Sequence, residues 1–144
     1  MLTQFLLGGA LTLATIVVAA LFWWALSSVL EKLRPWAEHP PHGPKLISLL
    51  VISLIWVLGM MTLAVWIWAV ALFALDIFSS FEEAVYFSLV AFTTLGFGDI
   101  LLPQEWRLLG GISAANGLLM IGLLTAILVE TLRETRTRQR KRKK

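Results

Sequence analysis

The sequence predicts an all-α membrane protein with three transmembrane helices and one short re-entrant helix. Its 144 residues are 58% hydrophobic and only 15% charged, with a mean hydropathy of +0.82. Four stretches contain no charged residue, namely 1–30, 46–75, 84–98 and 108–129. Because about 20 apolar residues cross a bilayer, the first, second and fourth stretches can span it, whereas the third is too short. This composition excludes a soluble enzyme, and we predict no enzymatic activity.

The first stretch predicts an N-terminal transmembrane helix over residues 1–30. It has no ladder of arginines, so it is not a charge-moving voltage sensor. Its small residues could pack against the rest of the chain; they are Thr3, Gly8, Gly9, Thr12 and Thr15. A peripheral helix is one alternative. A cleavable signal peptide is another, although the basic residues follow the apolar stretch instead of preceding it.

Basic residues predict which ends of the helices face the cytoplasm. Residues 133–144 hold eight basic residues and one acid, whereas residues 1–132 hold four basic residues and eight acids. Such a tail after a spanning helix indicates the cytoplasmic side, and three spans then place the N-terminus outside. The Pro-rich segment 31–45, expected to be a cytoplasmic loop, agrees because it contains Lys32, Arg34 and Lys45. We expect an integral protein of a bacterial inner membrane.

The polybasic tail is expected to bind anionic lipid, and nucleic acid is not expected as a partner. The lipid-facing residues would be Arg138, Arg140, Lys141, Arg142, Lys143 and Lys144. A solvated flank that only sets the topology is the alternative. The chain has no cysteine, which excludes thiolate metal sites. His39 and His42 could form a metal or pH site, but a stiff exposed loop is expected there.

Tryptophans flank both predicted boundaries of the membrane, as interfacial indoles do. The inner group is Trp23, Trp24 and Trp36, and the outer group is Trp66, Trp68 and Trp106. Trp56 falls in mid-span of the helix predicted over residues 46–75 and is expected to pack.

A short helix is predicted over residues 82–94, because no Gly or Pro interrupts it and Glu82 and Glu83 suit the positive end of its dipole. Its carboxyl end then points into the membrane. Gly96 and Gly98 follow it at a spacing of two, and both can adopt positive φ.

Residues 93–99, TTLGFGD, resemble the selectivity filter of potassium channels, whose usual form is TTVGYGD or its GFG variant. The resemblance implies a potassium-channel pore fold and a homotetramer, since one chain cannot surround such a segment. It also implies K⁺ as the permeant ion, no cofactor, and a filter at residues 94–98 flanked by Thr93 and Asp99. The backbone carbonyls that would bind K⁺ are those of Thr94, Leu95, Gly96 and Phe97, with the Thr94 hydroxyl beneath them.

The resemblance continues into a third span predicted over residues 106–132, within a pore domain of residues 46–132. Trp106, Arg107, Gly117 and Gly122 resemble the inner helix of two-helix bacterial potassium channels, in which the glycine matching Gly117 is a hinge. Close helix packing is the alternative role of such small residues. It is expected at Gly110, Gly111 and Gly122.

One face of this third span is expected to line the cavity and gate. Its residues recur at helical spacing and are Leu118, Ile121, Thr125 and Val129. Asn116 lies on the opposite face and must find a partner inside the bundle, because an unpaired amide is costly there. Glu130 could form a carboxylate ring or lie at the membrane interface.

Three substitutions distinguish this chain from the family pattern. Leu95 replaces Val, and Phe97 replaces a Tyr that elsewhere ties the filter to an aromatic collar, expected here at Tyr86 and Phe87. Val90 replaces a glutamate that pairs with the filter aspartate in some relatives, so Asp99 needs another partner.

We therefore predict passive, potassium-selective conduction. A weakly selective monovalent cation channel is one alternative, and a non-conducting membrane subunit or scaffold that keeps the pore fold is another.

Overall fold

The computed structural model describes residues 1–38 and 42–141, and that part of the chain is helical without any strand. The helices are α1 (Leu2–Glu38), α2 (His42–Ala74), α3 (Phe81–Phe92) and α4 (Arg107–Lys141), with a 3₁₀ turn, η1, at Gln104–Trp106. Of these, α1, α2 and α4 are long and apolar enough to cross a membrane. The predicted all-α class with three spanning helices is thus confirmed.

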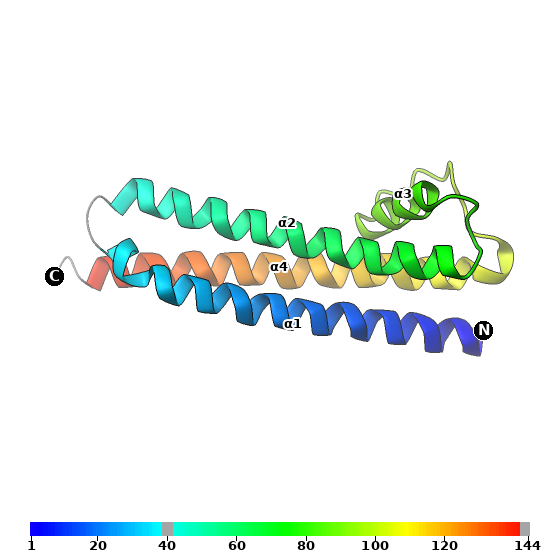
Figure 1. Cartoon of the computed structure of the whole chain (residues 1–144), viewed down its shortest axis with the longest axis horizontal. Helices are drawn as coiled ribbons and strands as arrows, with labels where there is room; N and C mark the ends of the chain where they lie inside the picture. The colour runs from blue at the N-terminus through cyan, green and yellow to red at the C-terminus, as the bar shows by residue number, and fades with distance from the viewer. Residues whose placement is uncertain (39–41, 142–144) are drawn as a thin grey trace.

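The three long helices lie side by side along one axis (Figure 1). Helices α1 and α4 run in the same direction and α2 runs against them, while the short α3 packs on α2 and α4. The N-terminus and α3 lie at one end of the bundle and the end of α4 at the other. This arrangement puts the glycine-rich segment after α3 in the half of the bundle that holds the N-terminus (Figure 1).

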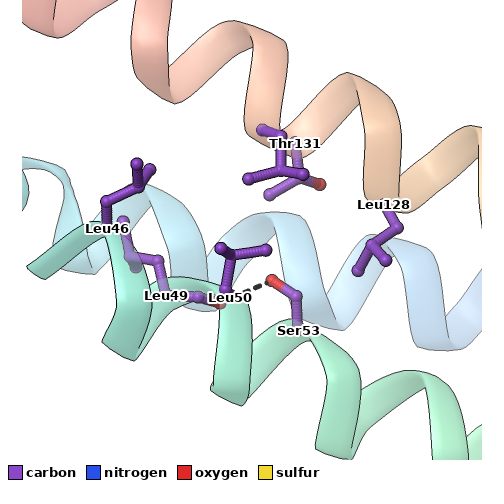
Figure 2. A pocket seen from close by; sticks show the side chains of 7 residues that line it. Leu46, Leu49, Leu50, Ser53, Leu128 and Thr131 are labelled. Atoms are coloured by element: carbon purple, nitrogen blue, oxygen red, sulfur yellow. Dashed lines mark hydrogen bonds between the residues drawn. The ribbon is translucent and has the colours of Figure 1, made fainter.

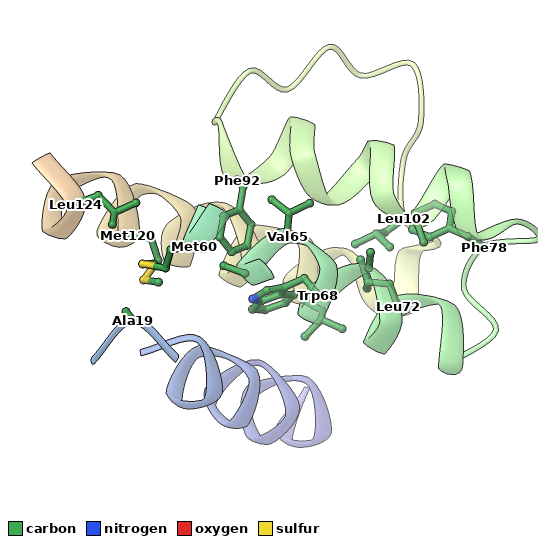
Figure 3. Close-up of a cluster of buried hydrophobic side chains, with 14 residues drawn as sticks. Ala19, Met60, Val65, Trp68, Leu72, Phe78, Phe92, Leu102, Met120 and Leu124 are labelled. Carbon is green, nitrogen blue, oxygen red and sulfur yellow. The ribbon is translucent and has the colours of Figure 1, made fainter. Parts of the chain in front are cut away.

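Apolar side chains from all four helices form one buried cluster, which Figure 3 shows around Trp68. Trp68 is fully buried, and its ring lies 6.4 Å from that of Phe92 between centroids. The expectation of an interfacial Trp68 is therefore wrong. The reason is that α3 packs over this part of α2 and covers the indole, whereas Trp66 on the neighbouring face stays half exposed.

The segment 31–45, expected to be an irregular loop, is largely helical. Helix α1 continues through Pro35 to Glu38, and α2 has Pro44 in its first turn, where the missing N–H of proline is tolerated. Lys45 joins the two helices: its Nζ donates to the Trp36 carbonyl at 2.8 Å and lies 5.1 Å from the centre of the Trp36 ring. His39 and the side chain of His42 lie outside the described residues.

Helix α4 also runs further than predicted, to Lys141 instead of residue 132. No Gly or Pro follows Gly122, and arginine and lysine favour helix, so the helix need not stop where the apolar stretch does. The side chains expected to face lipid, from Arg138 onward, lie outside the described residues.

Near the C-terminal end of α4, α2 and α4 leave a narrow gap lined by leucines, Ser53 and Thr131 (Figure 2). The Ser53 hydroxyl donates to the Leu49 carbonyl at 2.8 Å, and the Thr131 hydroxyl donates to the Ile127 carbonyl at 2.9 Å. These two hydrogen bonds lie within α2 and within α4, and leucine side chains of both helices line the gap between them.

Candidate functional site

The start of α3 is fixed by side chains that precede and enter it. Ser80 is the N-cap, and its hydroxyl accepts from the Glu83 N–H at 3.2 Å. The Ser79 hydroxyl donates to the Glu83 carboxylate at 3.0 Å. Glu82 and Glu83 lie in the first turn, where carboxylates favour the positive end of the helix dipole. These contacts set where α3 begins and hence which side chains it presents to α2 and α4.

The end of α3 differs from the prediction, because the helix stops at Phe92 and not at residue 94. The Thr94 N–H donates to the Ala91 carbonyl at 3.0 Å, and the Leu95 N–H donates to the Val90 carbonyl at 3.1 Å. This pair of bonds is a Schellman motif, which requires a left-handed residue at the position of Thr94. Thr94 has φ 57, a conformation that costs a β-branched residue about 1–3 kcal/mol.

Positive φ alternates along the segment Thr94–Gly98, which we call segment 94–98. Gly96 has φ 57 and Gly98 has φ 78, as predicted, and Thr94 is a third such residue that the sequence did not predict. Leu95 and Phe97 between them do not have positive φ. Alternating backbone handedness allows successive carbonyls to face one side, whereas in a strand they alternate between sides.

Segment 94–98 is open in a single chain. Leu95 is 58% exposed and Phe97 is 65% exposed. A Cβ added at Gly96 or Gly98 would meet no atom within 4 Å. Figure 3 shows the chain leaving α3 next to Phe92 and returning over that helix as an open arc toward Leu102. One copy of the chain therefore leaves this segment uncovered.

Asp99 has the partner that its position requires. The Tyr86 hydroxyl donates to the Asp99 carboxylate at 2.6 Å, which joins the end of segment 94–98 to α3. This hydrogen bond lowers the pKa of Asp99 and raises the pKa of Tyr86, because it favours the charged carboxylate and the neutral phenol. The sequence indicated that Asp99 needs a partner other than residue 90, but it did not identify Tyr86.

Tyr86 and Phe87, expected together as an aromatic collar, point to different surroundings. The Phe87 ring packs on Phe78, with 5.4 Å between centroids, and borders Gly110 of α4. Within the described part of the chain no ring contact joins Phe97 to either residue. Consecutive positions of α3 thus face different neighbours within one chain, and the collar that the resemblance implies around the filter stays a prediction.

Three of the four residues on the predicted lining face of α4 are exposed in a single chain. Leu118, Thr125 and Val129 are exposed and Ile121 is half-buried, while the opposite face buries Asn116, Met120 and Leu124. The Thr125 hydroxyl donates to the Ile121 carbonyl at 2.8 Å. Asn116 has found its expected partner within the bundle, which is Thr15 of α1.

Gly117 provides the closest backbone approach in this region. A Cβ there would overlap the carbonyl oxygen and Cα of Phe92, the last residue of α3. A Cβ at Gly110 would lie 2.6 Å from the Leu102 Cδ1, whereas Gly111 and Gly122 have nothing within 4 Å. The packing role expected at Gly111 and Gly122 is thus absent within one chain. Helix α4 continues unbroken through Gly117, whose role as a hinge stays a prediction.

Among the described residues no group of His, Asp or Glu side chains could hold a metal ion. The oxygen atoms that segment 94–98 offers to a cation are backbone carbonyl oxygens and the Thr94 hydroxyl.

Comparison with known proteins gave one result. A protein-family model described as ion channel matches residues 60–134, which is just over half of the chain. The match includes most of α4, all of α3 and segment 94–98, and it leaves α1 and the first part of α2 outside. No curated protein and no solved structure matches the chain.

Proposed function

The chain belongs to the ion channel family, and from that premise we propose that it forms a potassium-selective channel of four identical subunits. Each subunit contributes segment 94–98 to a central filter, and K⁺ passes down its gradient without a cofactor. The K⁺ ligands are the backbone carbonyls of Thr94, Leu95, Gly96 and Phe97.

The alternation of positive φ at Thr94, Gly96 and Gly98 is the observation that carries this proposal. A monovalent cation loses its hydration shell only where a column of oxygens replaces it. A backbone that alternates in handedness can supply several carbonyls in a row on one side. Thr94 takes part in this alternation because the Schellman motif after α3 holds it at positive φ.

The exposure of segment 94–98 supports the tetramer. Non-helical backbone at membrane depth is tolerated only when protein or a water-filled cavity surrounds it. One chain leaves Leu95 and Phe97 more than half exposed, so the remaining cover has to come from other copies. A closed fourfold ring of copies provides it and places four such segments around one axis.

The charges around the site suit a cation pathway. The negative end of the α3 dipole lies next to segment 94–98. Glu82 and Glu83 lie in the first turn of α3, Asp76 precedes this helix, and Asp99 follows segment 94–98. We propose that the end of the bundle that holds the N-terminus faces the outside, where the acids raise the local cation concentration. The C-terminal tail then lies in the cytoplasm, where each basic side chain near an anionic bilayer contributes about 1 kcal/mol of attraction.

Purified protein in liposomes tests the proposal. Native mass spectrometry of the same preparation should give the mass of four chains, and K⁺ loaded inside the liposomes should leave when an ionophore carries the compensating charge. A tetramer without K⁺ efflux would identify a non-conducting subunit. Equal efflux of K⁺ and Na⁺ would identify a weakly selective cation channel.

A further inference from the structure

Helix α1 lies outside the residues that match the ion channel family, yet polar contacts join it to α4. Both helices are apolar, and the inside of a membrane protein offers polar groups few other partners. A helix that only covered the bundle on its lipid side would need no polar contact with α4. The positions of these contacts along α4 therefore indicate what α1 holds in place.

Two contacts set the register of α1 along the first turns of α4. The Gln4 side-chain carbonyl accepts from the Leu109 N–H at 3.1 Å. Leu109 is the third residue of α4, where backbone N–H groups lack a partner within an α-helix. One turn along, a Cβ at Gly8 would lie 2.8 Å from the Ile112 Cδ1, so only glycine lets the helices approach this closely. Sliding of α1 along α4 would break both contacts.

The third contact joins Thr15 to Asn116, whose exposed fractions are 0% and 1%. The Asn116 amide nitrogen donates to the Thr15 hydroxyl at 2.9 Å. That hydroxyl has a single proton, which can go to the Thr12 carbonyl at 2.8 Å or to the Asn116 carbonyl oxygen at 3.2 Å. When the proton goes to the nearer acceptor, the Thr12 carbonyl, one chain of hydrogen bonds runs from Asn116 through Thr15 into the backbone of α1.

The residue after Asn116 is Gly117, which lies against the backbone of Phe92 without space for a methyl group. Phe92 ends α3, and the strained Thr94 follows two residues later. Because such packing leaves no gap, a shift of α4 at Asn116 displaces the residue from which segment 94–98 departs.

We propose that α1 positions the filter, and that Thr15 does so by holding Asn116 and thereby pressing Gly117 against the end of α3. The proposal rests on the filter assignment made above. Thr15 is a positioning residue, since it acts through α4 and α3 and contacts no ion.

Replacing Thr15 by Val removes the hydroxyl and keeps the shape of the side chain. Thr62→Val is the matched control, because Thr62 is an exposed threonine of α2 whose hydroxyl bonds only the Leu58 carbonyl of its own helix, at 2.9 Å. Thr15→Ser restores the hydroxyl and should restore wild-type behaviour. All three variants are purified as the full chain in lipid, and only preparations that match the wild-type oligomer are compared.

The first readout is amide hydrogen exchange at Thr93, Thr94 and Leu95, whose N–H groups bond carbonyls in the last turns of α3. Thr15→Val should speed exchange there by about threefold, the factor expected from an average interhelical side-chain hydrogen bond in a membrane. Thr62→Val and Thr15→Ser should leave it unchanged. Equal exchange in wild type and Thr15→Val would overturn the proposal, whether or not the protein conducts.

The second readout is the ratio of K⁺ to Na⁺ permeability in liposomes. Thr15→Val should lower this ratio by a similar factor, and the other two variants should not. A wild-type protein that fails to prefer K⁺ would refute the proposed function alone, because the exchange measurement does not depend on conduction. A normal ratio in Thr15→Val would show that α1 does not position the filter.

Discussion

Two regions of this chain place polar groups in an apolar protein, and they differ in whether those groups find partners within one copy. Along the contact between α1 and α4, Gln4, Thr15 and Asn116 are buried and find partners within the chain. Segment 94–98 is exposed, adopts strained backbone at Thr94 and leaves its glycines open. A single copy therefore satisfies the buried polar groups between α1 and α4 but leaves segment 94–98 uncovered, and the proposed tetramer supplies the missing cover.

The most severe change should come from Gly96→Ala within segment 94–98. Gly96 has φ 57, and a Cβ in this conformation costs roughly 1–2 kcal/mol per subunit, although the space around it is free. We expect K⁺ flux from liposomes to be abolished while the oligomer stays intact. Gly59→Ala is the control, because Gly59 lies in α2 with nothing within 4 Å and without positive φ. Undiminished flux in Gly96→Ala would refute the filter assignment.

Gly117, by contrast, is packed against the end of α3, and replacing it should change the stability of the protein. A methyl group would overlap the Phe92 backbone, and overpacking of this kind costs about 1–3 kcal/mol. Gly117→Ala should therefore lower the unfolding temperature of the solubilised protein, whereas Gly122→Ala, which meets no neighbour, should not. Normal stability with altered opening of the channel would instead favour the hinge role for Gly117.

A smaller effect is expected when the hydrogen bond from the Tyr86 hydroxyl to the Asp99 carboxylate is removed. The lowered pKa of Asp99 means that this bond stabilises the fold above pH 3.8 and that the contribution is lost as the pH falls through the lowered pKa. The raised pKa of Tyr86 means that the contribution is present below pH 10.0 and is lost as the pH rises through the raised pKa.

Tyr86→Phe removes the hydrogen bond, so the unfolding temperature should no longer show the loss of this bond's contribution at acidic pH or at alkaline pH. Asp99→Asn is the companion variant, since it keeps a hydrogen-bond acceptor but not the charge. Asp99→Asn should remove only the loss of stability at acidic pH. A profile of Tyr86→Phe that superimposes on the wild type would contradict the role given to this bond.

The weakest effect should follow removal of the polybasic tail. Deleting residues 138–144 should reduce the dependence of flux on anionic lipid, because each basic side chain adds only about 1 kcal/mol of attraction. A variant with glutamines in place of these basic residues keeps the length and should behave like the deletion. Flux that depends equally on anionic lipid in all three proteins would show that the tail only sets the topology.

The sequence was sufficient for features that depend on composition and on single residue types. Stretches without charge predicted the three long helices, and the spacing of Gly96 and Gly98 predicted their positive φ. Thr94 was not predictable in this way, because a β-branched residue normally avoids that conformation and only the Schellman motif after α3 imposes it. The prolines of residues 31–45 suggested an irregular segment. Pro44 instead lies in the first turn of α2, a position at which a helix accommodates proline.

Partners distant in sequence were beyond such reasoning. The buried amide of Asn116 predicted that a partner exists, but Thr15 lies 101 residues away and only the packing of α1 on α4 identifies it. Asp99 likewise required a partner, and the return of the chain over α3 supplies Tyr86. Trp68 was misassigned for the same reason, since its burial depends on α3 covering α2.

The reversal potential of the wild-type channel tests the central claim most directly. With unequal K⁺ concentrations on the two sides of a bilayer and Na⁺ making up the difference, carbonyls of Thr94 to Phe97 that replace the hydration shell of K⁺ should hold the potential near the K⁺ equilibrium value. The potential should shift with the K⁺ gradient and ignore the Na⁺ gradient. A reversal potential near zero under these conditions, or the absence of any current, would contradict the account.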